Sequence, residues 1–420
     1  MESISVEGGV PLRGSVRASG SKNAALPILA ATVLLDGEVR LSGIPRLRDV
    51  DTMIRLLRVL GCGVEHNADG TLSVGIDDAH PHEAPYEIVK EMRASVCMLG
   101  PLLARRGRAR VSLPGGCNLG IRPIDLHLKG LRALGAQLEI KGGYVNASGR
   151  LRGEEIFLAG PFGSTVLGTA NVMMAAVLAE GRTIIEAAAC EPEVADLARF
   201  LVACGARISG IGSPRLVING VEKLTPTDWR VIPDRMETGT YLAAAAITGG
   251  EVCVEGAQPA HMAAVLETLR RIGCRVERRM DGIFVKGPER PRAVDVTTLA
   301  YPGFPTDLQA PLTAVLSVAD GMSFITERIY PERFMHAPEL NRMGANIRKE
   351  GPSSILQGVE YLSGAEVMAS ELRGGAALIL AGLVARGQTT VHRVYHVDRG
   401  YHRIEAKLEA LGARIRRIST

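Results

Sequence analysis

The sequence predicts an α/β protein that is built from six repeats of about 70 residues, three in each of two domains. Two markers recur in phase along its 420 residues. In the first, a Gly at the end of an apolar stretch is followed by a small or polar residue and a β-like segment; these glycines are at 61, 135, 205, 273, 344 and 412. In the second, a Gly separates an Ala/Leu-rich stretch from a β-branched segment, at 37, 107, 181, 250, 321 and 387. Two independent markers with one period indicate six copies of one supersecondary unit.

The fourth repeat illustrates the elements that each copy is expected to contain. Residues 240–247 are apolar on all sides and predict a buried helix, which a Gly is expected to cap in the left-handed conformation. A strand follows at 251–255, and the apolar spacing of three and four within 262–269 predicts an amphipathic helix. That helix also ends at a Gly and leads into a hairpin over 276–285. The repeat is therefore of the βαβαβ type.

The repeats divide three and three at residues 223–235, which contain Pro226, Pro233 and the single Trp of the chain. Such a segment is typical of a crossing between domains. Two similar domains of about two hundred residues would enclose a cleft, and ligands tend to bind in clefts.

Composition excludes several classes of protein. Charged residues make up 22% and hydrophobic ones 46%, which rules out intrinsic disorder, and 48 Gly with only 4% aromatics predict a core of closely packed small side chains. The net charge of +4 is too small to indicate a nucleic-acid partner. The apolar stretches are shorter than the ~20 residues that span a bilayer, and the start does not resemble a signal peptide, so no membrane partner is expected.

No metal or cofactor is expected either. The seven cysteines form no CxxC pair, and the histidines lack the spacing of metal ligands. The sequence has no phosphate-binding loop of the Walker type and no GxGxxG after a strand. A reducing, cytoplasmic location is the expectation for such a chain.

Two segments of the first two repeats carry candidate chemistry. Lys22 and Asn23 stand at the start of a buried helix, where free backbone N–H groups and the helix dipole favour an anion. Cys117 follows Pro-Gly-Gly and precedes Arg122 by five residues, and a thiol on an electropositive loop can act as an acid or a nucleophile. A solvated lysine and a packed cysteine are the alternatives.

In later repeats a carboxylate and several arginines stand out. Asp307 opens the buried helix of the fifth repeat, where it could cap the helix or act as a general base for a hydroxyl. Arg93, Arg235 and Arg373 each lie near the start of a buried helix, and Arg399 follows in His-Val-Asp-Arg. Guanidinium groups at a recurring position favour the binding of carboxylate or phosphate over a simple surface role.

These motifs together resemble the enolpyruvyl transferases. The resemblance runs from end to end and rests on Gly-Ser-Lys22-Asn23, Pro-Gly-Gly-Cys117, Phe-Pro-Thr-Asp307, Arg-Phe-Met-His336 and Tyr-His-Val-Asp-Arg399. It implies two inside-out α/β barrel domains, each with three repeats about a pseudo-threefold axis. It also implies that the N-terminal strand crosses over, so that one domain is 22–232 and the other is 1–21 with 233–420, with the active site in the cleft between them.

The resemblance further implies a reaction and its residues. Phosphoenolpyruvate would lie between Lys22, Arg122 and Arg399, and its enolpyruvyl group would pass to the 3-hydroxyl of UDP-N-acetylglucosamine with release of phosphate, which opens peptidoglycan synthesis. Cys117 would protonate the vinyl carbon, could form a covalent adduct with phosphoenolpyruvate and would be alkylated by fosfomycin; Asp307 would take the hydroxyl proton. The residues implied for the sugar nucleotide and the anionic groups are Asn23, Arg93, Arg122, Pro123, Ile124, Asp125, Leu126, Thr165, Val166, Ile329 and Arg373.

Two alternatives remain open at this point. Residues 160–167 differ from the Ser-Val-Gly-Ala-Thr loop that contacts the nucleotide in this family, and Cys97 stands where a Trp is often found. The acceptor could therefore be another molecule, such as a free nucleotide. Shikimate 3-phosphate is disfavoured because that branch lacks the Pro-Gly-Gly-Cys loop. A protein that binds sugar nucleotide without catalysis is the other alternative, although Lys22, Cys117, Asp307 and Arg399 are all present.

Overall fold

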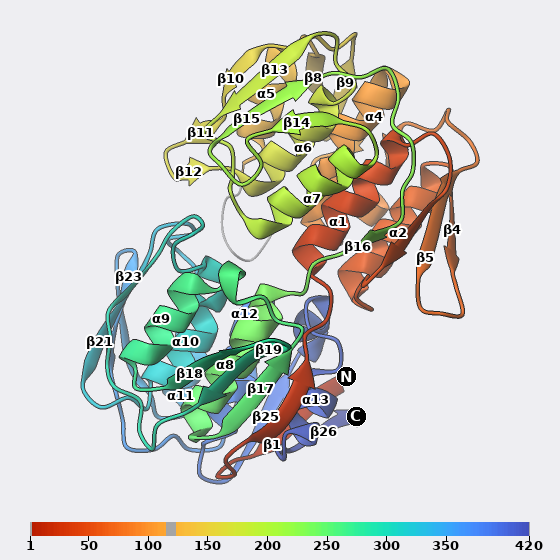
Figure 1. Ribbon diagram of the computed structural model, residues 1–420. Coiled ribbons are helices and arrows are strands. Elements are labelled where there is room, and N and C mark those ends of the chain that lie inside the picture. Colours follow the sequence, from red (N-terminus) through yellow and green to blue (C-terminus); the bar gives the residue numbers. More distant parts are fainter. Residues whose placement is uncertain (1, 115–122, 420) are drawn as a thin grey trace. The chain divides into compact units, whose positions relative to one another are not determined.

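The computed structural model describes residues 2–114 and 123–419 (Figure 1). The chain forms two compact units, each with its own hydrophobic core. We call them the N-terminal unit, which runs from Gly20 to Ile232, and the C-terminal unit, which combines the chain up to Ser19 with the chain from Pro233 onward.

Each unit repeats one pair of helices three times. The first helix of each pair is mostly buried, and the second is buried on one face except in α7, which is mostly buried as well. In the N-terminal unit the pairs are α1 (Lys22–Ala31) with α2 (Arg48–Val59), α4 (Leu99–Arg106) with α5 (Asp125–Ala133), and α6 (Val166–Ala176) with α7 (Pro192–Ala203). In the C-terminal unit they are α8 (Arg235–Thr248) with α9 (Ala263–Arg271), α10 (Gln309–Leu316) with α11 (Ala337–Arg342), and α12 (Leu372–Gly382) with α13 (Ile404–Ala410).

Short helical segments complete the helical part of the described chain. They are α3 (Tyr86–Val89) and the 3₁₀ turns η1 (Thr32–Leu34), η2 (Arg93–Met98), η3 (Pro259–His261), η4 (Thr306–Leu308) and η5 (Val394–Arg399).

Three four-stranded sheets surround the buried helices of each unit. Those of the N-terminal unit have the orders β16-β3-β5-β4, β6-β7-β9-β8 and β10-β13-β15-β14, and a small hairpin, β11-β12, stands apart. The strands are β3 (Val39–Ser42), β4 (Cys62–His66), β5 (Leu72–Ile76), β6 (Glu83–Ala84), β7 (Arg108–Ser112), β8 (Gln137–Lys141), β9 (Tyr144–Ser148), β10 (Glu155–Phe157), β11 (Ala159–Gly160), β12 (Gly163–Ser164), β13 (Arg182–Glu186), β14 (Arg207–Ser209), β15 (Arg215–Asn219) and β16 (Trp229–Arg230).

The sheets of the C-terminal unit have the orders β2-β17-β19-β18, β20-β21-β23-β22 and β24-β25-β1-β26. The strands are β1 (Glu2–Glu7), β2 (Arg13–Arg17), β17 (Glu251–Glu255), β18 (Arg275–Arg279), β19 (Gly282–Lys286), β20 (Val296–Thr298), β21 (Met322–Glu327), β22 (Asn346–Glu350), β23 (Ser353–Gln357), β24 (Glu366–Met368), β25 (Gln388–His392) and β26 (Arg414–Ser419).

All six four-stranded sheets share one pairing scheme, which confirms the six predicted repeats. The strand after the buried helix pairs in antiparallel fashion with the second strand of a hairpin, as β7 does with β9 (Val111 opposite Val145). On its other side it pairs in parallel with a short strand, as β7 does with β6. This short strand was not predicted. It has two or three residues in five of the six sheets and five in β2, and such short segments carry no detectable apolar alternation.

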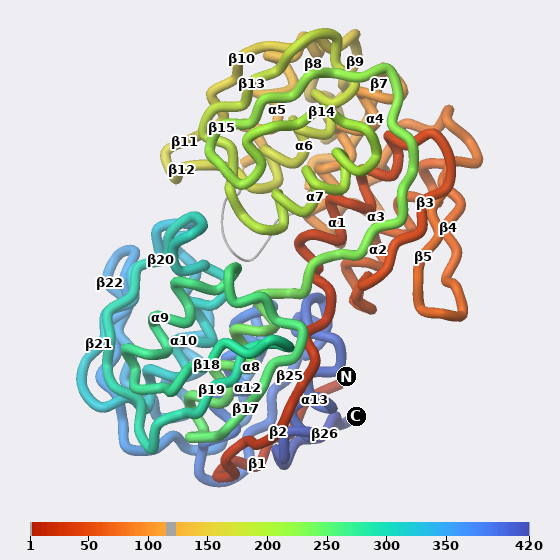
Figure 2. Tube along the Cα trace, in the orientation of Figure 1, coloured from red at the N-terminus to blue at the C-terminus, as the bar shows by residue number. Residues whose placement is uncertain are grey.

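The short strand links each repeat to the next and closes each unit into a ring. It follows the hairpin of one repeat and joins the sheet of the next, so β16 of the third repeat returns to β3 of the first. In the C-terminal unit the ring is closed by the start of the chain: β1 lies between β25 and β26, and β2 pairs with β17. The start of the chain, with β1 and β2, lies within the C-terminal unit (Figure 2). Each unit is thus a closed set of three similar repeats.

Glycines end the amphipathic helices as the sequence predicts. The six glycines of the first marker all have positive φ, between 80° and 104°. At Gly135 the N–H donates to the Arg132 carbonyl and the next N–H donates to Leu131, which is the Schellman arrangement.

The capping prediction is wrong for most of the buried helices. Gly107 and Gly249 cap α4 and α8 directly with positive φ, and the marker residue Gly250 is not itself the cap. α6 and α12 instead end five residues before Gly181 and Gly387, because one more turn of chain intervenes before each strand.

Small residues let the buried helices approach closely. A Cβ added to Gly100 of α4 would stand 2.2 Å from the carbonyl oxygen of Asn171 in α6, and one added to Gly239 of α8 would stand 2.3 Å from Leu308. The excess of Gly and Ala therefore reflects helix contacts in both cores. Within the described residues no helix is long and apolar enough to span a bilayer.

Candidate active site

In the N-terminal unit a buried ion pair lies at the start of α1. Lys22 is the first residue of the helix, as predicted, and Ser21 caps it by accepting a hydrogen bond from the N–H of Ala24. The Lys22 ammonium lies 3.1 Å from Oδ2 of Asp49, which belongs to the first turn of α2. Both side chains are about nine-tenths buried. Asn23, the second residue of α1, is partly exposed.

Arg93 lies beside a buried histidine. Arg93 begins the 3₁₀ turn η2, immediately before α4. The amide Nδ2 of Asn171 lies 3.0 Å from Nδ1 of His127 and also donates to the Val96 carbonyl. Because that nitrogen is a donor, Nδ1 of His127 is the acceptor and the ring proton is on Nε2. Burial, and secondly the charge of Arg93, lower the pKa of His127 to about 3, so the imidazole is neutral at physiological pH.

The residues implied for the nucleotide come from two helix starts of the same unit. Pro123 is exposed, and Ile124 to Leu126 lead into and begin α5. Thr165 caps α6 by accepting from the N–H of Gly168, and Val166 is the first residue of that helix. A Cβ on Gly160 in β11 would contact Leu126 at 3.4 Å, so the 159–164 hairpin packs against the start of α5. These residues therefore lie in one neighbourhood.

In the C-terminal unit Asp307 is held by two arginines. It lies in η4, one turn before α10, and its side chain is about one quarter exposed. Oδ1 accepts from Nη1 of Arg333 at 2.7 Å, and Oδ2 accepts from Nε and Nη2 of Arg373 at 3.2 and 3.0 Å. Both carboxylate oxygens of Asp307 therefore accept hydrogen bonds from guanidinium groups.

The two arginines are themselves fixed by buried groups. Glu371 caps α12 by accepting from the N–H groups of Arg373 and Gly374, and it lies 3.4 Å from Nη2 of Arg333. The Arg373 guanidinium is fully buried over the ring of Tyr401. His336 is buried beside them, and burial lowers its pKa to about 4. Two buried arginines, Arg333 and Arg373, thus flank the partly exposed carboxylate of Asp307.

Glu327 organises the chain next to Asp307. Its carboxylate accepts from Thr298 and Thr306 at 2.5 and 2.8 Å and from the backbone N–H of Ile329 and Tyr330. Because Thr306 immediately precedes Asp307, the same carboxylate positions both Ile329 and the η4 turn.

Arg399 and Arg235 complete the candidates in this unit. Arg399 is the half-buried last residue of η5, and its neighbour Asp398 forms a two-bond ion pair with Arg417. Arg235 is the buried first residue of α8, and its guanidinium lies 5.5 Å from the centre of the Tyr301 ring. Cys117 and Arg122 lie outside the described residues.

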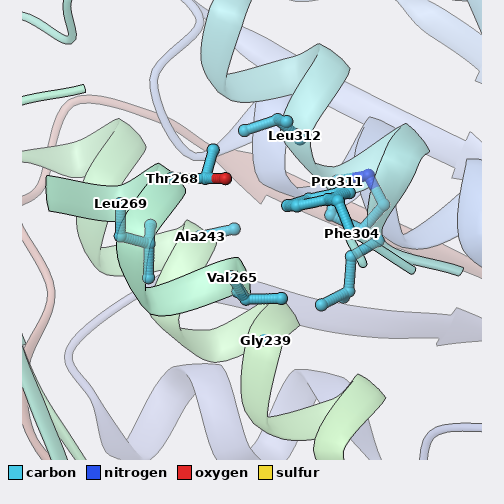
Figure 3. A pocket seen from close by; sticks show the side chains of 9 residues that line it. Gly239, Ala243, Val265, Thr268, Leu269, Phe304, Pro311 and Leu312 are labelled. Atoms are coloured by element: carbon cyan, nitrogen blue, oxygen red, sulfur yellow. The ribbon is translucent and has the colours of Figure 1, made fainter. Parts of the chain in front are cut away.

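The described part of these units shows no metal cluster. No group of three His, Cys, Asp or Glu side chains in residues 2–114 and 123–419 is arranged to hold a metal ion. An open pocket of about 600 Å³ in the N-terminal unit, lined by Leu103, Arg150 and Glu180 among others, contains none of the candidate residues. A small apolar cavity between α8, α9 and α10 has a volume of about 10 Å³, the lower limit for one water molecule (Figure 3). It contains none of the candidate residues and is too small for a substrate.

Sequence reasoning missed four residues of these clusters. Asp49, Arg333, Glu327 and His127 are buried, and each contacts or lies beside a predicted site residue or the η4 turn. A buried charged residue carries no mark in a single sequence. The only available signal in the sequence was the Arg-Phe-Met-His336 motif, which contains Arg333.

Comparisons with known proteins agree along the whole chain. The family model of EPSP synthase (3-phosphoshikimate 1-carboxyvinyltransferase) matches residues 6–408. A UDP-N-acetylglucosamine 1-carboxyvinyltransferase of Anaeromyxobacter sp. (strain Fw109-5) is 55% identical, with 99% of each chain covered. One of Myxococcus xanthus (strain DK1622) is 53% identical, again with 99% of each covered.

Solved structures share the fold. The enolpyruvyl transferase NikO from Streptomyces tendae is 25% identical, with a TM-score of 0.88 over 99% of this chain and 98% of that one. An EPSP synthase from Acinetobacter baumannii is 21% identical, with a TM-score of 0.74 over 100% of both chains, and shows the fold alone.

Proposed function

The chain belongs to the EPSP synthase family of enolpyruvyl transferases, and from this premise we propose how its residues carry out the reaction. The protein transfers the enolpyruvyl group of phosphoenolpyruvate to the 3-hydroxyl of UDP-N-acetylglucosamine, releases phosphate and so begins peptidoglycan synthesis. The full-length identity of 55% decides between the acceptors that the sequence left open.

The proposed base for the acceptor hydroxyl is Asp307. A base must be ionised and must have room to accept a proton. Two guanidinium groups on separate oxygens favour the carboxylate form of Asp307, and the quarter of its side chain that is exposed leaves room for a hydroxyl. This geometry is the observation that carries the proposal.

Cys117 is the proposed acid, and the cationic side chains bind the anions. Asp307 takes the proton of the 3-hydroxyl as its oxygen bonds to the central carbon of phosphoenolpyruvate, while the Cys117 thiol protonates the vinyl carbon. Loss of phosphate and of a proton from the new methyl group then restores the double bond. Lys22, Arg122 and Arg399 would bind phosphoenolpyruvate, and Arg373 would orient Asp307.

The acceptor would be bound mainly by the N-terminal unit. Asn23, Arg93, Pro123, Ile124, Asp125, Leu126, Thr165 and Val166 are proposed for the sugar and the nucleotide, with Ile329 from the C-terminal unit. The starts of α1, α5 and α6 offer backbone N–H groups and positive dipole ends, which favour the diphosphate.

Six cysteines among the described residues are unpaired, which supports a reducing, cytoplasmic location.

Turnover and a covalent adduct test the proposal together. The protein is expected to release phosphate only when both substrates are present. Intact-mass spectrometry with phosphoenolpyruvate is expected to show an adduct that disappears in Cys117→Ser, and fosfomycin should modify the parent protein but not that variant. Absence of phosphate release at saturating substrates would refute the function; full turnover of Cys117→Ser would refute only the acid.

A further inference from the structure

The pair of Lys22 and Asp49 points to a role that the overall reaction does not assign. Both partners of this ion pair are about nine-tenths buried: the exposed fractions of the side chains are 11% for Lys22 and 6% for Asp49. Their helices, α1 and α2, pack against one another (Figure 1). Each residue lies in the first turn of its helix, so the pair joins two helix starts.

A buried pair of this kind contributes little net stability. Removing two charges from water costs several kcal/mol per ion, which their attraction only roughly offsets. A pair of well-packed apolar side chains would serve a purely structural purpose at least as well. The geometry therefore favours a purpose for the ammonium group itself.

Orientation is the property that Asp49 supplies. A lysine side chain has four rotatable bonds and about 2 kcal/mol of rotamer entropy, so an unrestrained ammonium group is poorly placed for any one anion. The 3.1 Å contact with Oδ2 fixes the ammonium at the start of α1, next to the free N–H groups of that helix. An ammonium has three donors, so a lysine that bonds to a carboxylate can also donate to an anion.

We propose that Asp49 is a positioning residue that holds the Lys22 ammonium in place for the phosphate of phosphoenolpyruvate. This inference rests on the proposed function of Lys22. Asp49 itself does not touch the reacting atoms; it acts through Lys22. Its effect therefore concerns the binding of the phosphoryl donor and not that of the sugar nucleotide.

Asp49→Asn tests the proposal, because it keeps the size of the side chain and one acceptor oxygen but removes the charge. The KM for phosphoenolpyruvate and the inhibition constant of inorganic phosphate are expected to rise about tenfold or more, as for a lost hydrogen bond between charged groups. The KM for UDP-N-acetylglucosamine should stay within twofold and kcat within about threefold. A merely structural role would instead lower the folded fraction and leave both KM values unchanged.

Two further variants sharpen the test. Asp51→Asn changes an exposed acid in the same turn of α2, and all three constants should equal those of the parent protein. Asp49→Glu keeps the charge on a longer side chain; its KM for phosphoenolpyruvate should lie between those of the parent and Asp49→Asn. It also serves for measurement if thermal unfolding shows that Asp49→Asn is not folded.

Results that would contradict the role of Asp49 differ from a result that would contradict the proposed function. An unchanged or lower KM for phosphoenolpyruvate in Asp49→Asn would overturn the inference, since a lower value would mean that the carboxylate mainly repels the phosphate. Equal changes in both KM values would also overturn it. If the parent protein itself releases no phosphate, the proposed function fails, and this result does not depend on Asp49.

Discussion

At the scale of single residues, the environment of each charged group determines what it can do. Asp307 is placed between guanidinium groups that come 26 and 66 residues later in the chain. The Arg333 and Arg373 side chains are almost fully buried, whereas Asp307 is partly open. A carboxylate that is fixed by buried cations and open on one side is suited to accept a proton and to lose it again.

Replacement of Arg333 by Met is expected to narrow the pH range in which the proposed base, Asp307, is ionised. Without a cation 2.7 Å away, the Asp307 carboxylate accepts a proton more readily, so the acidic limb of the kcat profile should move to higher pH. Arg333→Lys, which keeps the charge, should restore part of that shift. Measurement of kcat from pH 5 to 9 checks this. A lower kcat without movement of the acidic limb would count against the role.

The buried side chain of Asp196 in α7 makes the stability of the protein depend on pH. Burial raises its pKa to about 6, although it accepts a hydrogen bond from the N–H of Ile232. Because this value lies above the ~3.9 of an unfolded chain, the folded state holds the proton between about pH 4 and 6. This group therefore makes stability fall as the pH rises through that window, and the cost persists above it.

Asp196→Asn should remove this cost, because an amide keeps the acceptor oxygen and carries no charge. The variant is expected to be more stable than the parent by about 2 kcal/mol at pH 8 and about equal to it at pH 4. Urea unfolding at the two pH values provides the comparison. An equal difference at both values would show that ionisation is not the cause.

At the scale of elements, each repeat is defined by how its helices begin and end. The predicted glycines end the amphipathic helices, since each adopts a positive φ that other residues avoid. The helix starts carry the candidate chemistry: Lys22 in α1, Arg93 before α4, Thr165 before α6 and Arg373 in α12. The C-terminal ends of the helices thus carry the glycines that the fold requires, and the N-terminal ends carry the candidate site residues.

Gly344 offers a clean test of the helix ends. Its φ is +90°, and a Cβ added there would meet no atom within 4 Å, so only backbone strain opposes a side chain. Gly344→Ala should lower the free energy of unfolding by about 1–2 kcal/mol, and Gly344→Asn by less. Gly75→Ala is the matched control, because Gly75 does not have positive φ and the nearest atom would be 3.6 Å away. A loss at Gly75 as large as at Gly344 would contradict the explanation.

At the scale of the whole molecule, the two units are closed by segments that are far away in the sequence. β1 occupies the place that the second strand of a hairpin takes in the other five four-stranded sheets. Its register sets Glu2 opposite Ser419, so the two ends of the described chain lie side by side. The last repeat is therefore completed by the first residues of the protein.

A circular permutant tests this closure. Joining the ends of the chain through a short turn, with new termini between the exposed Met280 and Asp281, should give a folded enzyme with kcat within about threefold of the parent. Deletion of residues 2–7 should prevent folding of the C-terminal unit, since β1 buries Ile4 and Val6 and pairs on both edges. Circular dichroism and turnover distinguish the two designs. A stable, active deletion variant would refute the structural role of β1.

Much of the fold and part of the candidate site could be predicted from the sequence. Repeats, helix ends and apolar faces are local patterns, so the glycine spacing was enough to count six units of two helices each. Lys22, Asp307 and Arg373 were found because each stands at a predicted helix start within a recognisable motif. The short parallel strands could not be predicted, because pairing with a neighbouring repeat defines them and their own residues do not.

The sequence by itself determined the number and kind of repeats and the close packing of small residues that explains the excess of Gly and Ala. It also determined which cationic residues could bind an anionic substrate. Only the tertiary structure decided which charges meet. It paired Lys22 with Asp49 and Asp307 with Arg333, and it completed the sixth repeat with β1. The physical reason is that an ion pair or a strand pair forms between residues that are distant along the chain. Such contacts depend on how the helices of a repeat pack and on how the repeats close into a ring, and they have no periodic trace in the sequence.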